Sequence, residues 1–249
     1  MMRLLPAAGT FLLLLAAGAC AMAASRETPS TGQSPQELRR RVVREVQGRY
    51  LLFLPAGYAG SGSESWPLIL FLHGAGERGD DLEKVAIHGP PKLVVERPDF
   101  PFIVVSPQVP EERIWSIQFL DALLDEVTER YRVDPERIYV TGLSMGGYGT
   151  WHLAMEYPHR FAAIAPISGG ATITGACTLR HLPIWVFHGA QDEVVPPSRS
   201  EELVARLRGC EGNVRFTLYP DAGHDAWTRT YENPELYDWF LQHRRALTP

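Results

Sequence analysis

Apolar residues in this chain gather in short unbroken runs, and between the runs lie segments in which apolar residues return every three or four positions. Unbroken apolar runs of about 4 to 8 residues are typical of strands buried on both faces, and the wider spacing is typical of amphipathic helices. Their alternation predicts an α/β fold with a mostly parallel, twisted sheet covered by helices on both faces. The expected strands are Leu68–His73, Phe102–Ser106, Ile138–Leu143, Ala162–Ser168, Ile184–His188 and Val214–Tyr219, and the expected helices are Ser116–Tyr131, Gly146–Tyr157, Ser198–Arg208 and Pro234–Leu247.

The first residues have the features of an export signal. Arg3, the long apolar run after it and the small residues around Ala23 provide the charged, apolar and cleavage-site parts of a signal peptide over residues 1–23. Acylation of Cys20 is the alternative, although Ala17 stands where lipoprotein signals usually have leucine. The protein is therefore expected to be secreted or periplasmic, and to meet a membrane only if Cys20 is lipidated.

The remaining chain predicts one folded domain behind a linker. Residues 24–36 are rich in Ser, Thr, Pro and Gly, which is typical of a disordered tether, and the domain is expected over 37–249. It should open with antiparallel strands at Arg39–Val46 and Arg49–Leu54. Residues 170–181 are too few to form a separate cap domain at this place, so no sizeable cap is expected and the site should be open.

A candidate nucleophile follows one of the expected strands. Gly142 and Gly146 flank Ser144 in a G-x-S-x-G pattern between a strand and a helix, where small residues allow the sharp turn that exposes a serine hydroxyl. Such a serine needs a carboxylate and a histidine in later loops, in that order. Asp192 and His224 each follow a later strand, so Ser144, Asp192 and His224 are predicted to form a catalytic triad.

An attacked carbonyl also needs backbone N–H donors facing its oxygen. The Met145 amide, at the start of the helix after the nucleophile, is the first expected donor. The loop that follows the apolar run Pro67–His73 should supply the second. Ala75 is the first choice for this donor and Gly76 the alternative.

Several motifs in the same order resemble one family. The segments Phe71–Asp81, Gly142–Trp151, Pro183–Pro197 and Gly223–Trp227 are similar to those of the α/β-hydrolases, and in particular of secreted carboxylesterases of the prolyl-oligopeptidase-like or phospholipase/carboxylesterase group. That group is related to polyhydroxybutyrate depolymerases and feruloyl esterases. The resemblance covers about residues 49–242 and implies serine-dependent hydrolysis of a carboxylic ester through an acyl-enzyme.

Two other functions remain open at this point. The family name also suggests a serine peptidase, although no propeller-like domain precedes the hydrolase to select peptides. The second alternative is a catalytically inactive binding protein of the cell envelope. Binding alone needs no triad, so the three candidates in order favour the enzyme.

Charge and composition limit the classes of molecule that the protein is expected to bind. The formal net charge is −5, and loss of residues 1–23 removes one arginine and no acid, so nucleic acid is not an expected partner. His88, His152 and His159 lack partners at metal-ligand spacing, and no metal or cofactor is expected. Trp227, beside His224, is a candidate substrate-binding residue, for a small-molecule or polymeric ester.

Two cysteines remain after the signal peptide. Cys177 precedes the expected strand at Ile184, and Cys210 precedes the expected strand at Val214. In a hydrolase sheet these strands are parallel neighbours, so both cysteines should lie near the same, non-catalytic end. Export to an oxidising compartment then favours a Cys177–Cys210 disulfide.

Overall fold

The computed structural model describes residues 37–40, 43, 45–59 and 62–245. The compact unit spans Arg44–Pro249, and the described residues ahead of it contain no helix or strand. The predicted signal peptide and tether fall on residues 1–36 and so lie outside the described residues. No described helix has the length and the apolar character needed to cross a membrane.

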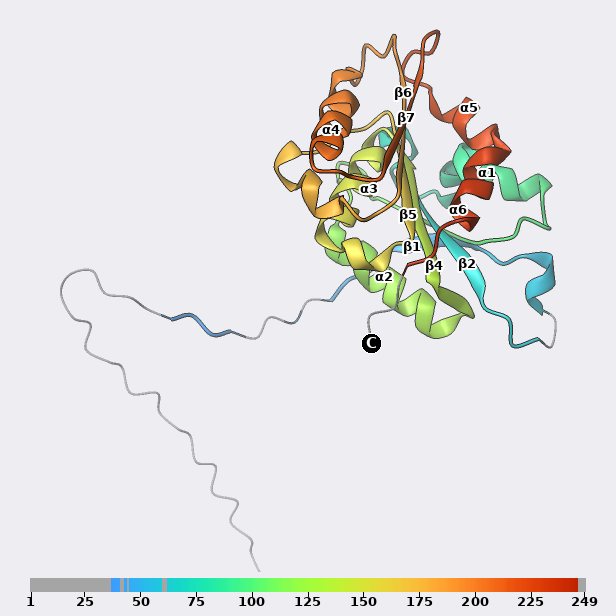
Figure 1. The fold of residues 1–249 in the computed structure, drawn as a ribbon. Helices are drawn as coiled ribbons and strands as arrows, with labels where there is room; N and C mark the ends of the chain where they lie inside the picture. The colour runs from blue at the N-terminus through green and yellow to red at the C-terminus, as the bar shows by residue number, and fades with distance from the viewer. Residues whose placement is uncertain (1–36, 41–42, 44, 60–61, 246–249) are drawn as a thin grey trace, which may run out of the picture. The chain divides into compact units, whose positions relative to one another are not determined.

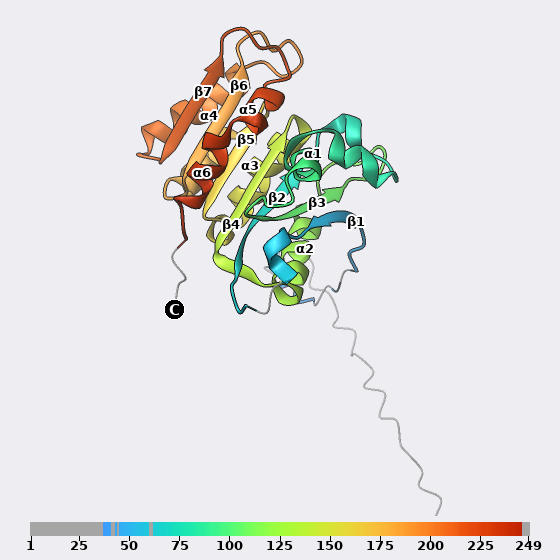
Figure 2. The same cartoon turned by 90° about the vertical axis from the view of Figure 1, so that its right-hand side faces the viewer.

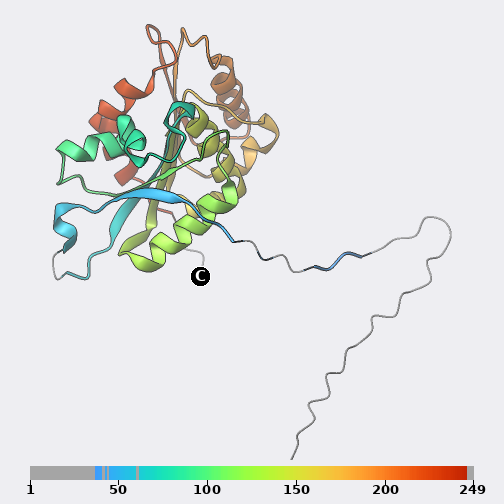
Figure 3. The same cartoon turned by 180° about the vertical axis from the view of Figure 1, so that it is seen from behind.

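A seven-stranded sheet in the order β1-β3-β2-β4-β5-β6-β7 forms the centre of this unit (Figure 1). β1 runs antiparallel to β3, and all other neighbours are parallel. Figure 2 shows the sheet face, and Figure 3 shows it from behind with β1 in front. The strands are β1 (Arg49–Phe53), β2 (Trp66–Leu72), β3 (Ile103–Gln108), β4 (Val133–Leu143), β5 (Ala163–Ile167), β6 (Ile184–Gly189) and β7 (Val214–Tyr219). The helices are α1 (Gly89–Glu96), α2 (Ile117–Arg130), α3 (Met145–Glu156), α4 (Ser198–Gly209), α5 (Trp227–Glu232) and α6 (Pro234–Leu241).

Central strands such as β2 are buried on both faces. Leu68, Leu70 and Leu72 point into one apolar cluster, and Ile69 and Phe71 point into the other. Successive side chains of a strand point to opposite faces, so an unbroken apolar run supplies both layers of core at once. The α/β architecture with a mostly parallel sheet that these runs predict is confirmed.

The helices divide between the two faces of the sheet (Figure 1). Helices α2, α3 and α4 pack on one cluster, and α1, α5 and α6 cover the other. The start of α2 illustrates the local chemistry, because the Ser116 hydroxyl accepts a hydrogen bond from the Phe119 amide at 3.3 Å and caps the helix. Residues 170–181 hold only a short 3-10 helix, Ile173–Leu179, so the structure has no sizeable cap there.

The structure corrects some predicted boundaries. The described residues between 39 and 46 form no strand, whereas the strand expected at Arg49–Leu54 is present as β1 and runs antiparallel to β3. Val43 is 81% exposed, so the segment lacks the burial that favours a strand. The last helix ends at Leu241, short of the predicted Leu247.

Two short helices are not among the helices expected from the sequence. Helix α1 has Pro90 and Pro91 in its first turn, where proline fits because those amides have no helical acceptor. Helix α5 is only six residues long, from Trp227 to Glu232. Neither segment is long enough to show a helical period in the sequence.

Candidate active site

The Ser144 backbone adopts an unusual conformation between β4 and α3. Its φ of 52° and ψ of −115° are costly for a residue with a side chain. A Cβ on Gly146 would lie 1.8 Å from the Leu72 carbonyl oxygen, and one on Gly142 would lie 2.5 Å from the Gly146 carbonyl oxygen. Only glycine fits at both positions, which explains the flanking pattern and leaves the serine side chain projecting from the turn.

The structure brings the three predicted triad residues together. Nε2 of His224 lies 2.9 Å from the Ser144 hydroxyl oxygen, and Nδ1 lies 2.7 Å from Oδ2 of Asp192. The other carboxylate oxygen of Asp192 accepts the amides of Val194 and Val195, each at 2.9 Å. The three side chains come from the loops after β4, β6 and β7, at the carboxyl edge of the sheet.

Electrostatics fix the protonation pattern of this chain of groups. Burial alone raises the pKa of Asp192, but hydrogen bonds from His224, Val195 and Val194 outweigh it, so the pKa of the carboxyl group lies below its usual value. The ionised carboxylate accepts the Nδ1 hydrogen of His224. Nε2 is then the acceptor for the Ser144 hydroxyl, which is the arrangement of a general base beside a nucleophile.

The loop after β2 is tied down by hydrogen bonds of its own. The Gly74 amide donates to Oε2 of Glu77 at 2.9 Å, and Nε of Arg78 donates to the Ala75 carbonyl at 2.9 Å. Nε2 of Gln108, on β3, donates to the Glu77 carbonyl at 2.9 Å. Since the Gly74 amide is engaged, Ala75 and the residue after it remain the candidate donors of this loop.

The candidate donor on the other side is the Met145 amide. Met145 is the first residue of α3, and the first amides of a helix have no acceptor within the helix. The positive end of the helix dipole lies at the same place. The Met145 amide and the amides of the 75–76 loop therefore remain the candidate oxyanion donors.

His73 and Ser168 hold backbone segments next to the site through hydrogen bonds. Nδ1 of His73 lies 2.6 Å from the Gly74 carbonyl, and its Nε2 accepts the Val109 amide at 3.0 Å. The Ser168 hydroxyl donates to the His224 carbonyl at 2.9 Å from a backbone φ of 48°. Sequence reasoning missed Ser168, and its position directly after β5 was the signal that could have found it.

A cavity of about 380 Å³ opens beside Ser144. Apolar and aromatic side chains dominate its wall, which is formed with Ser144 by Ile114, Trp115, Met145, Tyr148, Gly149 and His152. Trp227 stands perpendicular to the His224 ring at 5.1 Å between centroids. It lines a second cavity of about 190 Å³ between α1 and α5, and not the cavity that Ser144 lines.

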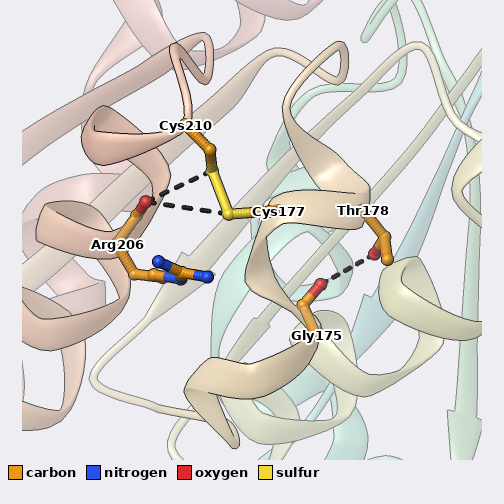
Figure 4. The surroundings of a disulfide bond; sticks show 5 residues. All are labelled: Gly175, Cys177, Thr178, Arg206 and Cys210. Carbon is orange, nitrogen blue, oxygen red and sulfur yellow. Dashed lines mark hydrogen bonds between the residues drawn. A yellow bond between two sulfur atoms is a disulfide. The ribbon is translucent and has the colours of Figure 1, made fainter.

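Cys177 lies in the segment before β6, and Cys210 lies in the segment before β7. Cys177 and Cys210 form a disulfide with their Cα atoms 6.0 Å apart. Figure 4 shows both sulfurs facing the Arg206 carbonyl of α4. Within the described ranges no three His, Cys, Asp or Glu side chains come close enough together to hold a metal ion.

The twisted, mostly parallel sheet and the serine turn with its later carboxylate and histidine define an α/β-hydrolase. The phospholipase/carboxylesterase family matches residues 108–234, and the chain belongs to this family. The resemblance seen in the sequence motifs is therefore confirmed.

Individual relatives are esterases by name. The chain is 27% identical over 227 residues to a probable feruloyl esterase C of Aspergillus niger, across 87% of this chain and 82% of that protein. It is 29% identical over 126 residues to a bifunctional acetylxylan esterase/xylanase of Neocallimastix patriciarum, across 49% of this chain and 18% of that protein. A solved thermostable esterase is similar with a TM-score of 0.69 and 35% identity, across 79% of this chain and 59% of that one. The chain thus spans only part of the last two relatives.

Proposed function

We propose that this protein is a serine carboxylesterase that works through an acyl-enzyme. The observation that carries the proposal is the hydrogen-bonded chain from Ser144 through His224 to Asp192, built on a strained turn. Family membership and the esterase names of the relatives support the same activity.

Each group has a role in the proposed reaction. Nε2 of His224 takes the Ser144 hydroxyl proton while the serine oxygen bonds to the ester carbonyl carbon. Asp192 holds the ring and stabilises its positive charge. The tetrahedral intermediate expels the alcohol, which leaves with the proton from His224. Water then attacks the acyl-enzyme with the same base, releasing the carboxylic acid and restoring Ser144.

The oxyanion is proposed to develop between the start of α3 and the loop after β2. The Met145 amide and the Ala75 amide, with Gly76 as the alternative, are proposed to donate to it. Loss of one such donor costs about 3 to 4 kcal/mol in other acyl-transfer enzymes. The anchoring of the loop by Glu77 and Arg78 supports this role, because preorganised donors need no rearrangement during the reaction.

The cavity beside Ser144 is proposed to hold one side of the ester. Its apolar and aromatic wall suits an acyl group of limited size. Trp227 packs against His224 but lines the neighbouring cavity. We therefore propose that Trp227 contacts only the periphery of the bound substrate. The alcohol can be small or polymeric, because residues 170–181 form no cap over the site.

Action outside the cytoplasm is part of the proposal. The Cys177–Cys210 disulfide supports it, because such bonds persist in oxidising compartments. The signal-like first residues point to cleavage after Ala23, with lipidation of Cys20 as the alternative. The intact mass of the exported protein separates a mature chain starting at Ala24 from a lipidated one.

The deciding experiment combines active-site labelling with turnover. A fluorescent organophosphonate should label the wild type and the Ser198→Ala control, whose serine is exposed on α4, but not Ser144→Ala. Turnover of p-nitrophenyl esters should fall by at least about 10⁴-fold in Ser144→Ala. Persistent labelling of Ser144→Ala would overturn the assignment, and faster turnover of peptide p-nitroanilides than of esters would indicate a peptidase.

A further inference from the structure

A second histidine lies against the proposed triad carboxylate. His188, near the end of β6, is fully buried and precedes Asp192 by four residues. Its Nε2 lies 2.9 Å from the Val195 carbonyl oxygen and 3.1 Å from Oδ2 of Asp192. Both of these oxygens are acceptors, so Nε2 must carry a hydrogen.

The other ring nitrogen is fixed by helix α4. Nδ1 of His188 lies 2.7 Å from the Ser200 hydroxyl, which also lies 3.1 Å from the Gly169 carbonyl. Ser200 is itself buried, so no bulk water competes for these groups. The ring therefore has a partner at each nitrogen and one orientation that satisfies both.

We propose that His188, oriented by Ser200, is a positioning residue that holds the Asp192 carboxylate toward His224. This inference rests on the proposed function. Oδ2 of Asp192 lies between Nδ1 of His224 at 2.7 Å and Nε2 of His188 at 3.1 Å. The Val195 carbonyl belongs to the turn whose amides bind Oδ1, so a single N–H group of His188 faces both the carboxylate and the turn that carries it.

His188 does not act on the substrate. It is absent from the residues lining the cavity beside Ser144, and its contacts reach the reaction only through Asp192. If His188 is removed, Oδ2 of Asp192 loses the N–H group that faces it in a buried site, and the Val195 carbonyl of the 192–195 turn loses its hydrogen-bond donor. A small displacement of His224 would slow the reaction strongly, because misplacement of a catalytic group by about 1 Å can reduce a rate by about 10²-fold.

The test compares three variants with the wild type. His188→Leu removes the donor, His188→Gln keeps an N–H group within reach of the Nε2 position, and Val204→Ala truncates a buried apolar side chain of α4. His188→Leu should lower kcat by about 10- to 100-fold with little change in KM, and His188→Gln should recover most of the loss. Val204→Ala should keep the wild-type kcat although it is less stable.

A proton NMR signal gives a readout that a merely structural role would not move. The Nδ1 hydrogen of His224 in its short bond to Asp192 should resonate far downfield in the wild type and in His188→Gln. It should weaken or vanish in folded His188→Leu. If His188→Leu does not fold, Ser200→Ala takes its place, with a smaller loss of kcat and a weakened signal expected.

The outcomes separate the two proposals. Wild-type kcat and signal in His188→Leu, or in Ser200→Ala if that replaces it, would overturn the positioning role while leaving the esterase intact. Equal losses in Val204→Ala, or failure of glutamine to recover activity, would also overturn it. Full activity of Ser144→Ala would instead overturn the proposed function, and the inference with it.

Discussion

Lowering the pH should destabilise this protein through His73. The side chain is fully buried at the end of β2, and its Nε2 accepts the Val109 amide. Burial lowers the pKa of His73 from 6.5 to about 4, with the Gly74 hydrogen bond opposing the shift and the Arg78 charge adding to it. If Nε2 were protonated, its N–H group and the Val109 N–H group would face each other in a buried site, and neither would have an acceptor.

The magnitude follows from proton linkage. Between pH 6.5 and about 4 the unfolded chain holds a proton on His73 and the native protein does not, so the unfolded state gains stability as the pH falls. His73 thus contributes its full stability above its unfolded pKa. The contribution shrinks by about 1.4 kcal/mol per pH unit, which amounts to about 3 kcal/mol by the folded pKa.

Urea unfolding of the wild type and His73→Gln isolates this contribution. Glutamine can place an acceptor oxygen near Val109 and does not titrate, and all other histidines are common to both proteins. The difference in unfolding free energy between the two should move by about 3 kcal/mol in favour of His73→Gln as the pH falls from neutral to about 4. Parallel pH profiles for the two proteins would refute the reasoning.

Three further outcomes follow from the structure. The double variant Cys177→Ser/Cys210→Ser opens a loop with a sequence separation of 33. It should lose about 4 kcal/mol and roughly 10 °C in Tm with kcat at 25 °C unchanged, and an unchanged Tm would contradict this. Gly146→Ala places a Cβ 1.8 Å from the Leu72 carbonyl and should cost about 3 kcal/mol or more in urea unfolding, whereas Gly209→Ala meets nothing within 4 Å and serves as control. Short p-nitrophenyl acyl chains should be preferred without a rate jump above the solubility limit, since no cap opens on a lipid surface; such a jump would contradict the argument.

The strands were predictable because one unbroken apolar run supplies the buried side chains for both faces of the sheet. The apolar run of β2 fills both faces of the sheet, and Leu68 to Leu72 are all fully buried. The proposed triad was predictable for a related reason. Its three residues follow β4, β6 and β7, and the carboxyl ends of parallel strands meet at one edge of the sheet.

Other features depend on partners that a sequence does not reveal. Residues 39–46 are rich in arginine and valine, as an edge strand can be, but the described residues among them form no strand. The contacts of His188 join residues 188, 192 and 200, and the last of these is reached only across a helix whose docking angle depends on the whole core. Polar contacts of this kind follow from tertiary packing and not from spacing.

Two strained backbones lie where the nucleophile and the base meet. Of the four described residues with side chains and positive φ, Ser144 and Ser168 lie at the ends of the neighbouring strands β4 and β5, and Glu112 and Glu211 lie in the segments before α2 and β7. Such backbones cost about 1 to 3 kcal/mol each and persist only when the surroundings determine them. The Ser144 amide donates to the Ile167 carbonyl at 2.9 Å, and the Ser168 amide donates to the Phe187 carbonyl at 2.9 Å, so each turn is anchored to the next strand of the sheet. One serine thereby presents its hydroxyl to His224 and the other holds the His224 backbone, which ties the geometry of the site to the order of the strands.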